Sequence, residues 1–392
     1  MTEWKECTIA DLGMVVGGAT PSTKDPENYD GGTIPWITPK DLSNYSDRYI
    51  SKGERNITEK GLNGCSTQLM PRHSVLFTSR APIGYVAIAE NEVCTNQGFK
   101  SVVPNEQTDY LFLYYLLKYN KEKIEGLGSG TTFKEVSGST MRGITVRVPE
   151  SIDAQRIIGR YLDSIDSKIE INRRINENLL QQAQAIFTRE LLMFDAVPDS
   201  WQEGSLLDIA DYLNGLAMQK FRPKEGEQGL PVLKIKELRQ GTCDDSSELC
   251  SPSIKPEYIV HDGDVIFSWS GSLLVDLWCG GTCGLNQHLF KVTSSKYDKW
   301  FYYAWTNHHL DKFAAIAAGM ATTMGHIKRE ELAKAEVLIP SKADYDRIGG
   351  LLAPLYDLVI ANRIENRKLA AFRDELLPQL MSGQIDVSEV SL

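Results

Sequence analysis

Two long stretches of the chain carry apolar residues at every third or fourth position. One begins after Pro149 and the other after Pro340, and this spacing is typical of helices that pack together in a coiled coil. The first series is Ile158, Leu162, Ile165, Ile169, Asn172, Asn176, Leu179, Ala183 and Ile186. The second series is Ile348, Leu352, Leu355, Val359, Asn362, Asn366, Leu369, Arg373, Leu376 and Leu380. We predict two helices of roughly 35 to 40 residues, each on the order of 55 Å long.

Asparagine occupies the same two places in both series. Asn172 and Asn176 recur as Asn362 and Asn366, at a constant offset of 190 residues. Asparagine in an apolar seam lowers stability but fixes register, because the buried amides find partners only in the intended alignment. We therefore predict that these four residues set the register of the coiled coil. The alternative is an ordinary amphipathic helix on which the asparagines face water.

The globular stretches that precede the two helices also resemble each other. Their matches keep their order along the chain, at an offset of about 190 to 197 residues. The matched segments are Trp4–Glu6 with Trp201–Glu203, Ile34–Leu42 with Leu230–Leu238, Val75–Arg80 with Val265–Ser270, Asn96–Lys100 with Asn286–Lys291 after one inserted residue, Thr131–Thr132 with Thr322–Thr323, and Val146–Pro149 with Leu338–Pro340. The order of these matches predicts an internal repeat.

Each globular stretch mixes strands and helices. Short apolar runs such as 74–78 and 264–268, bounded by Gly, Pro, Asp and Asn, predict strands. Helical spacing of aromatic and aliphatic residues predicts helices over 110–125 and 297–318. We predict an α+β fold with two similar modules separated by two long antiparallel coiled-coil helices. The predicted parts are module 1–149, helical spacer 150–197, module 198–340 and helical spacer 341–392, related by an internal pseudo-two-fold repeat.

Length and composition restrict the class of protein. The 392 residues suffice for two or three domains, and no apolar run approaches the roughly 18 to 20 residues of a membrane span. The opening MTEWKECTIADLG lacks the basic and then apolar pattern of a secretory signal, so we expect a cytoplasmic protein without a membrane partner. The seven cysteines are scattered and favour reduced thiols, and no ligand spacing predicts a metal site.

The net charge of −10 argues against a chain that binds nucleic acid alone, because such proteins usually present a basic domain to the phosphates. It is compatible with a complex in which partner chains make most phosphate contacts and this chain makes the base contacts.

A duplicated chain can do what a DNA-binding dimer does, which is to place equivalent reading elements on two half-sites at a separation fixed by the protein. Because the two copies are free to diverge, the half-sites can differ in sequence and can be separated by bases that are not read. The length of the helices would set that gap.

Motifs for catalysis are absent from the sequence. There is no Gly-rich phosphate loop ending in Gly-Lys-Ser/Thr, and no Asn-Pro-Pro-aromatic or Asp-Pro-Pro-aromatic stretch of the kind amino-methyltransferases use. The six histidines form no recognisable acid–base or nucleophile arrangement. We predict a protein without catalytic residues and without a cofactor of its own.

With this organisation, the chain resembles the specificity subunits of type I restriction-modification enzymes over essentially its whole length. Three sets of residues carry the resemblance: the Ile34–Ile37 segment with Lys40-Asp41-Leu42, the pairs Asn96-Gln97 and Asn286-Gln287, and the pairs Asn172-Arg173 and Asn362-Arg363. No single motif is diagnostic, but their ordered duplication is fairly specific. The resemblance implies two target-recognition domains that read double-stranded DNA in two parts. It also implies two methyltransferase subunits that use S-adenosylmethionine and motor-nuclease (restriction) subunits, with that cofactor and ATP bound only by the partners.

Polar and basic residues in loop-like segments are the candidates for DNA contact. In the first module they are Lys40, Thr78, Ser79, Arg80, Thr131, Thr132 and Lys134. In the second they are Lys234, Lys236, Ser268, Trp269, Ser270, Lys291, Thr322, Thr323 and Lys328. The alternatives are solvated surface lysines and ordinary turn chemistry. Asn96 and Gln97 recur as Asn286 and Gln287, and this favours a structural role, because residues that read different half-sites should differ between the copies.

The sequence leaves two other functions open. One is an enzyme whose motifs are too degenerate to recognise, and methyl transfer or cleavage by the isolated chain would establish it. The other is a scaffold without DNA, in which twin modules on a coiled coil gather proteins. The acidic composition favours the scaffold, and a reconstituted complex with no preference for any DNA sequence would support it.

Overall fold

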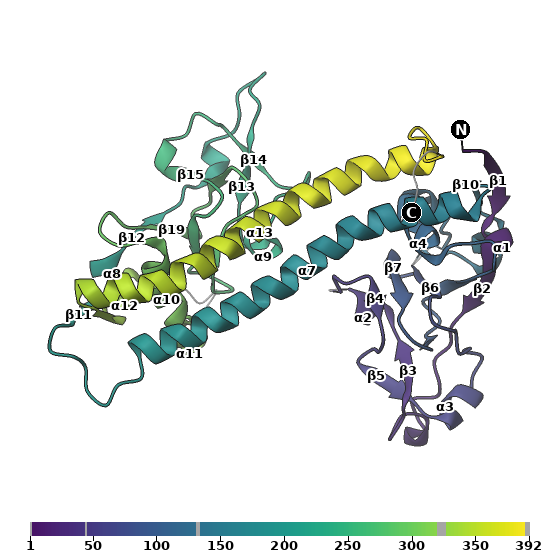
Figure 1. Cartoon of the computed structure of the whole chain (residues 1–392), viewed down its shortest axis with the longest axis horizontal. Coiled ribbons are helices and arrows are strands. Elements are labelled where there is room, and N and C mark those ends of the chain that lie inside the picture. Colours follow the sequence, from purple (N-terminus) through teal and green to yellow (C-terminus); the bar gives the residue numbers. More distant parts are fainter. Residues whose placement is uncertain (1, 44, 131–133, 320–326, 389–392) are drawn as a thin grey trace. The chain divides into compact units, whose positions relative to one another are not determined.

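The computed structural model describes residues 2–43, 45–130, 134–319 and 327–388. The chain forms two compact units: unit 1 comprises residues 1–170 with 369–392, and unit 2 comprises residues 171–368. Each unit contains one globular module and one segment of each of the two long helices, which are α7 and α13 in Figure 1.

Unit 1 builds its module from three small sheets and short helices. The sheet orders are β1-β10, β2-β9-β6-β7-β4 and β5-β3-β8. The strands are β1 (Trp4–Thr8), β2 (Gly13–Gly17), β3 (Ile34–Ile37), β4 (Tyr49–Ile50), β5 (Arg55–Ile57), β6 (Val75–Ser79), β7 (Ile83–Ala89), β8 (Cys94–Thr95), β9 (Lys100–Pro104) and β10 (Thr145–Pro149). The helices are α1 (Ile9–Leu12), α2 (Pro39–Leu42), α3 (Glu59–Asn63), α4 (Tyr110–Tyr119), α5 (Lys121–Gly126) and α6 (Gly138–Gly143).

Unit 2 builds its module in the same manner. The sheet orders are β11-β20, β12-β19-β16-β17 and β14-β13-β18-β15. The strands are β11 (Gln202–Ser205), β12 (Asp211–Asn214), β13 (Leu230–Leu233), β14 (Leu249–Cys250), β15 (Ile259–Val260), β16 (Val265–Ser268), β17 (Leu274–Leu277), β18 (Cys283–Leu285), β19 (Leu289–Thr293) and β20 (Glu336–Ile339). The helices are α8 (Leu206–Ile209), α9 (Ile235–Gln240), α10 (Lys299–His308), α11 (Leu310–Gly319) and α12 (Arg329–Ala333).

The two modules share one topology. The antiparallel order β2-β9-β6-β7 recurs as β12-β19-β16-β17, and the parallel pair β3-β8 recurs as β13-β18. In each module a two-stranded sheet, β1-β10 or β11-β20, joins the start of the module to the strand that precedes a long helix. This confirms the predicted α+β fold and the internal repeat.

The two long helices are α7 (Ile152–Leu191) and α13 (Lys342–Ser382). Their segments run antiparallel within each unit. In unit 2 Asn172 pairs with Asn366 and Asn176 with Asn362, so the residue numbers rise on one helix as they fall on the other. In unit 1 Arg373 bonds Asp166, while Leu380 shares a hydrophobic cluster with the earlier residues Ile158 and Leu162. The residues with the predicted three-four spacing therefore pack α7 against α13 within each unit.

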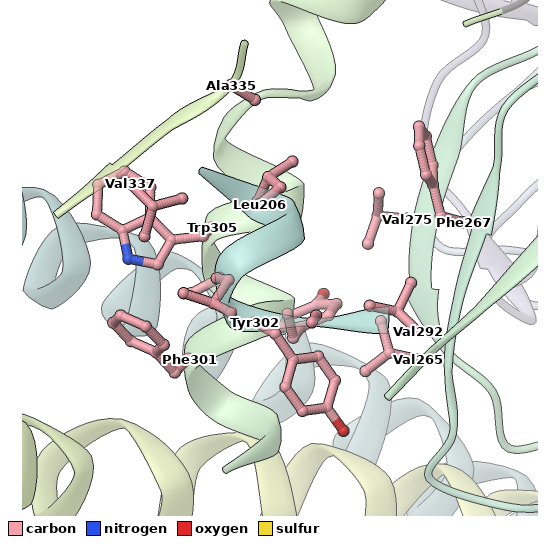
Figure 2. Packing of buried hydrophobic residues seen from close by; sticks show 14 of the residues in the cluster. Leu206, Val265, Phe267, Val275, Val292, Phe301, Tyr302, Trp305, Ala335 and Val337 are labelled. Carbon is pink, nitrogen blue, oxygen red and sulfur yellow. The ribbon is translucent and has the colours of Figure 1, made fainter. Parts of the chain in front are cut away.

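Each module packs its main sheet and aromatic helices against its segments of α7 and α13. In unit 2 the cluster joins Val265 and Phe267 of β16 to Phe301 and Trp305 of α10 (Figure 2). In unit 1 the corresponding cluster is formed around β6 and α4. Figure 2 shows Val265, Val275 and Val292 on the side of the sheet, and Phe301 and Trp305 together with Val337 on the other side of the helix. Burial of this apolar area is the main source of stability for each unit.

The predicted aromatic helices differ from the observed ones in their continuity. The segment 110–125 is two helices, α4 and α5, which meet at Asn120, whose side-chain amide donates to the carbonyl of Leu116. The segment 297–318 begins two residues late, after the N-cap Asp298, and it breaks at His309 between α10 and α11. Apolar spacing continues through both corners, so it could not reveal the breaks.

No helix among the described residues is both long and apolar enough to cross a membrane.

Candidate DNA interface

Thr78, Ser79 and Arg80 were predicted to contact DNA from a loop-like segment, but Thr78 and Ser79 are the last two residues of β6. Thr78 and Ser79 are fully buried. The Thr78 hydroxyl accepts a hydrogen bond from the backbone N–H of Tyr85 (2.8 Å), and the Ser79 hydroxyl donates to the carbonyl of Gly98 (3.2 Å). Their burial conflicts with base reading, because hydroxyls that cannot reach water cannot reach a base edge. They secure the turn, and Arg80 is the half-exposed side chain that follows it.

The equivalent turn of unit 2 is also largely buried. The Ser268 hydroxyl donates to the carbonyl of Ser272 (2.9 Å), and the Ser270 hydroxyl lies 3.2 Å from Nδ1 of His288. Both serines are buried, so the same correction applies to them. Trp269 is half-buried, with its indole N–H 3.0 Å from Oδ1 of Asn214 and its ring stacked on Phe290 at a centroid distance of 5.6 Å.

Arg80 belongs to a basic group of side chains in unit 1. Its guanidinium lies 3.7 Å from a carboxylate oxygen of Glu135, and the Lys100 ammonium lies 3.4 Å from the other oxygen of the same carboxylate. Lys134 is exposed beside Glu135, and Arg142 lies close to Lys100 around Gly138. We call Arg80, Lys100, Lys134 and Arg142 the basic face of unit 1. The predicted Thr131 and Thr132, together with Thr322 and Thr323, lie outside the described residues.

Lys40 and Lys236 occupy equivalent positions in the first turns of α2 and α9. In both helices an acidic residue, Asp41 or Glu237, accepts the hydrogen bond of the N-cap backbone N–H, which explains the recurring motif. The Lys40 ammonium is exposed and lies 2.6 Å from Glu54, and this hydrogen bond raises the pKa of Lys40. The Lys236 ammonium is exposed and donates to the Ser246 hydroxyl (2.9 Å).

Lys234 also lies at this end of α9, one position before the helix. Its ammonium is 2.6 Å from Glu248, and this hydrogen bond lowers the pKa of the Glu248 carboxyl. Lys40, Lys234 and Lys236 can thus turn to a phosphate only by exchanging a contact they already have. Surface ion pairs of this kind are weak, so the exchange costs little.

Lys291 does not correspond to Lys100, contrary to the prediction from the sequence repeat. Val75 pairs with Val102 in unit 1, and Val265 pairs with Val292 in unit 2. The segment between the two paired valines therefore has the same length in both modules. The predicted inserted residue does not exist: Lys100 matches Phe290, and Lys291 matches Ser101. The Lys291 ammonium is mostly buried between Asp264 (2.8 Å) and the carbonyl of Ile259 (2.9 Å), which removes it from the candidate surface.

Backbone contacts identify the residue of the first module that corresponds to Lys328. The backbone N–H of Ile327 donates to the carbonyl of Trp269, and the backbone N–H of Val136 donates to the carbonyl of Ser79, both at 2.9 Å. Lys328 is therefore the counterpart of Ser137, and both residues are helix N-caps. Lys328 is exposed and stays a candidate for phosphate contact.

The recurring asparagines in the loops before β9 and β19 shape the backbone. Asn96 accepts from the N–H of Gly98 (2.8 Å) and Asn286 from the N–H of His288 (3.2 Å). A Cβ at Gly18 or Gly215 would lie 2.2 Å from the carbonyl oxygen of the neighbouring asparagine, so the chains meet closely at both places. This agrees with the structural role favoured by their recurrence.

The four asparagines of the helical seam contact one another in unit 2. The Asn172 amide donates to Asn366 (2.8 Å) and to Glu365 (2.6 Å), and the Asn362 amide donates to Asn176 (2.9 Å). Asn172, Asn176 and Asn362 are at most 9% exposed. A shift of one helical turn would separate these amides, so their geometry is that of register-setting residues.

Some residues of this surface were missed from the sequence. Lys100 and Arg142 belong to the basic face but were not predicted. Lys100 stood inside a recognised repeat segment, where Lys291 was predicted as the contact residue and Lys100 was not. Arg142 had no signal beyond its charge.

Comparison with known proteins fits this duplicated architecture. The family described as type I restriction modification DNA specificity domain matches twice, over residues 1–181 and 198–370. The type I restriction enzyme MjaIX specificity subunit of Methanocaldococcus jannaschii is 32% identical over 99% of this chain and 95% of its own length. The EcoR124I/EcoR124II specificity subunit of Escherichia coli is 28% identical over 50% of each chain.

A solved structure shows the same fold. The S subunit of a type I restriction-modification system from M. genitalium aligns with a TM-score of 0.58 at 16% identity, covering 97% of this chain and 96% of that chain. With two family matches and a relative similar over its full length, this chain belongs to the type I restriction modification DNA specificity family.

Proposed function

We propose that this chain is the subunit of a type I restriction-modification complex that reads a DNA target in two parts. The observation that carries the proposal is one sheet topology present twice, with different side chains at equivalent exposed positions. Ser137 and Lys328 are one example, since they are equivalent helix N-caps that are both exposed. Equal scaffolds with unequal surfaces suit two unequal half-sites. Residues 1–149 and 198–340 are the proposed target-recognition domains, with 150–197 and 341–392 as the spacers between them.

The proposed partners are double-stranded DNA, two methyltransferase subunits and restriction subunits that carry the motor and nuclease. The chain itself has no catalytic role in this proposal, and S-adenosylmethionine and ATP bind only to partners. The net charge of −10 supports a shared DNA interface, because this chain alone offers few unneutralised cations to the phosphates. A cytoplasmic location, where the DNA is accessible, completes the proposal.

The experiment that tests this function is co-expression of the full chain with its native methyltransferase, followed by mapping of adenine methylation across the host DNA. We expect methylation within a two-part sequence that has an unread gap of constant length. Methylation in one continuous sequence would contradict the proposal. A complex that prefers no DNA sequence would favour a scaffold instead.

Exchange of the first module tests the division of labour. Residues 1–149 are replaced by the corresponding module of another member of the family, and the methylated sequence is mapped again. We expect one half of the target to change and the other half, together with the gap, to stay the same. A change in both halves would show that the modules do not read independently.

A further inference from the structure

A pocket of about 260 Å³ opens in unit 1 between the start of β7 and the end of α4. Its lining includes Tyr85, Tyr114, Lys118 and Lys121, and Asp47 is the carboxylate among the described residues that line it. Two lysines against one carboxylate make the lining cationic. None of the predicted DNA-contact residues lies in this pocket.

Lys118, in the last turn of α4, is a half-buried cation without an anionic partner. Its ammonium lies 3.5 Å from the Tyr114 hydroxyl and 5.2 Å from the centre of that ring. Among the described residues no carboxylate oxygen lies within 4.0 Å of it. Burial and the nearby Arg373 guanidinium lower its pKa, although Asp166 partly opposes them. A cation removed from water without a carboxylate in ion-pair contact is costly, and an incoming anion would relieve that cost.

Lys121 opens α5 and lines the same pocket. Its aliphatic stem lies against Gly84, where a Cβ would be 2.6 Å from Cγ of the lysine. Gly84 has a φ of +98°, so a side chain there would be strained as well as obstructed. The bare backbone of Gly84 lets the Lys121 stem cross β7. Lys121, like Lys118, has no carboxylate partner within ion-pair distance in the described part of the chain.

The pocket adjoins the basic face of unit 1. Gly84 and Tyr85 belong to β7, whose first residue, Ile83, comes three positions after Arg80. At Gly128 a Cβ would touch both Ile83 and Lys134, so the turn and the loop of Lys134 lie together. Lys118 and Lys121 therefore extend the positive charge of Arg80 and Lys134 to the corner between α4 and α5.

We infer that this pocket binds a phosphate group of the DNA backbone beside the half-site read by the first module, and that Lys118 and Lys121 contact this phosphate. The inference rests on the proposed function and adds a site to it. Phosphate contacts position a protein on the duplex and carry no sequence information. The pocket thus fixes how the first module lies on DNA rather than which bases it reads.

The second module lacks this pair of cations. The N-caps Asp109 and Asp298 align α4 with α10, which places Asn307 at the position of Lys118 and Leu310 at the position of Lys121. Neither residue carries a positive charge. The site therefore belongs to the first half-target alone, and the two halves should contribute unequally to the salt dependence of binding.

The test measures binding of the complex of full-length chain and native methyltransferase to a duplex containing its mapped target, over a series of salt concentrations. The variants are Lys118→Met and Lys121→Gln. We expect each to make the slope of log K against log salt shallower by about one, because each removes one phosphate contact. The matched control is Lys60→Gln, which removes the same charge from a lysine already paired with Asp25 and Glu27, and its slope should equal that of the wild type.

Thermal unfolding without DNA separates binding from structure. Lys118→Met keeps the aliphatic stem and removes an uncompensated charge, so its Tm should equal or exceed that of the wild type while its DNA binding weakens. A lower Tm together with weaker binding would indicate a structural lysine and would overturn the inference. If Lys118→Met fails to fold, Lys121→Gln still tests the inference, because Lys121 is exposed and its replacement should not disturb the fold.

Three further outcomes separate free phosphate from DNA phosphate as the ligand of the pocket, and separate this inference from the proposed function. If inorganic phosphate raises the Tm of the wild type but not of the variants, and the DNA slopes are unchanged, the pocket takes free phosphate and the inference is wrong. Unchanged slopes with intact target preference would overturn the inference and leave the proposed function standing. Absence of any target preference in the wild-type complex would contradict both the inference and the proposed function.

Discussion

In both units ion pairs attach the module to a long helix, but the part that supplies the cation differs between the units. In unit 1 the module supplies the cation: Arg48 is 6% exposed and bonds Asp163, Ser167 and Glu170 of α7. In unit 2 the helix supplies the cations. Arg363 and Arg367 of α13 bond Asp276 and Asp262 of the module, both at 2.7 Å.

This reversal shows which parts of the repeat have been retained and which have been rebuilt. Strand order and helix-capping motifs recur, because a sheet with altered order would no longer cover its helices. The attachment to α7 or α13 needs only complementary charges, and either side can supply the cation. The two modules therefore have the same fold but are not interchangeable in their contacts with the helices.

Removal of Arg48 is the largest single perturbation that this comparison predicts. Arg48→Met leaves Asp163 and Glu170 partly buried without their cation, and burial already raises the pKa of Asp163. We expect unit 1 to lose about 3 kcal/mol of unfolding free energy, as in other broken buried ion pairs. Hydrogen exchange of unit 1 peptides would measure the loss.

Arg363→Met is the matched variant in unit 2. Its pair is more exposed, at 30% and 22% for the two side chains, so we expect a loss of about 1 kcal/mol. Equal losses in the two units would show that the anchors are equivalent and that the reversed direction has no energetic consequence.

The seam of the helices gives a second contrast. Unit 1 pairs Asp166 with Arg373 at 2.5 Å, whereas unit 2 pairs amides, Asn176 with Asn362. Asn362→Leu leaves the Asn176 carbonyl oxygen without its donor, so we expect a loss of about 2 kcal/mol in unit 2. Chemical denaturation of the full chain would measure it.

The double variant Asn176→Leu with Asn362→Leu sharpens this prediction. With both amides replaced by apolar groups, most of the lost stability should return, since neither amide of this pair is left without its partner. A double variant as unstable as the single one would mean that packing, rather than the amide pair, determines the stability of this part of the seam.

The sequence was sufficient for features that depend on periodicity and order. The long helices followed from three-four spacing, and the paired asparagines followed from a constant offset between the copies. Strands such as β6 and β16 followed from short apolar runs between turn residues. In each case the signal is local or is repeated along the chain, so no knowledge of distant contacts was needed.

The candidate site depended on contacts between distant residues, and there the sequence was insufficient. Thr78 and Ser79 look like turn residues, and only the fold shows that Tyr85 and Gly98 occupy their hydroxyls. Arg48 stands in a polar stretch and resembles a surface residue until α7 is placed beside it. Lys291 looked equivalent to Lys100 until the strand pairing fixed the register.

Acid should distinguish the two units. Burial lowers the pKa of His309 at the corner of α10 and α11, and the neighbouring His308 and Lys312 act in the same direction, against a hydrogen bond to the carbonyl of Glu336. The corresponding corner of unit 1 carries Asn120, which does not titrate.

A histidine whose folded pKa is lowered binds fewer protons in the folded state than in the unfolded state. Its contribution to stability is therefore complete above the ordinary pKa of about 6.5 and is lost as the pH falls below that value. We expect unit 2 peptides to lose exchange protection before unit 1 peptides do as the pH falls below about 6.5. His309→Asn should reduce this difference, and an unchanged difference would assign the acid sensitivity to other groups.

The smallest expected effect on stability is at the exposed lysines of α2 and α9. Lys40 and Lys236 occupy equivalent positions with solvated partners, so Lys40→Gln and Lys236→Gln should leave the Tm of both units unchanged. If these lysines exchange their surface partners for DNA phosphates, each variant should still weaken binding about equally to target and non-target duplexes. Salt titrations of the methyltransferase complex would measure this, with Lys60→Gln as the control. Because the two lysines lie at matching positions, effects of equal size would show that phosphate positioning is shared by the two modules at this helix. An effect confined to Lys40→Gln would extend the asymmetry of the α4–α5 corner to the whole DNA-facing surface.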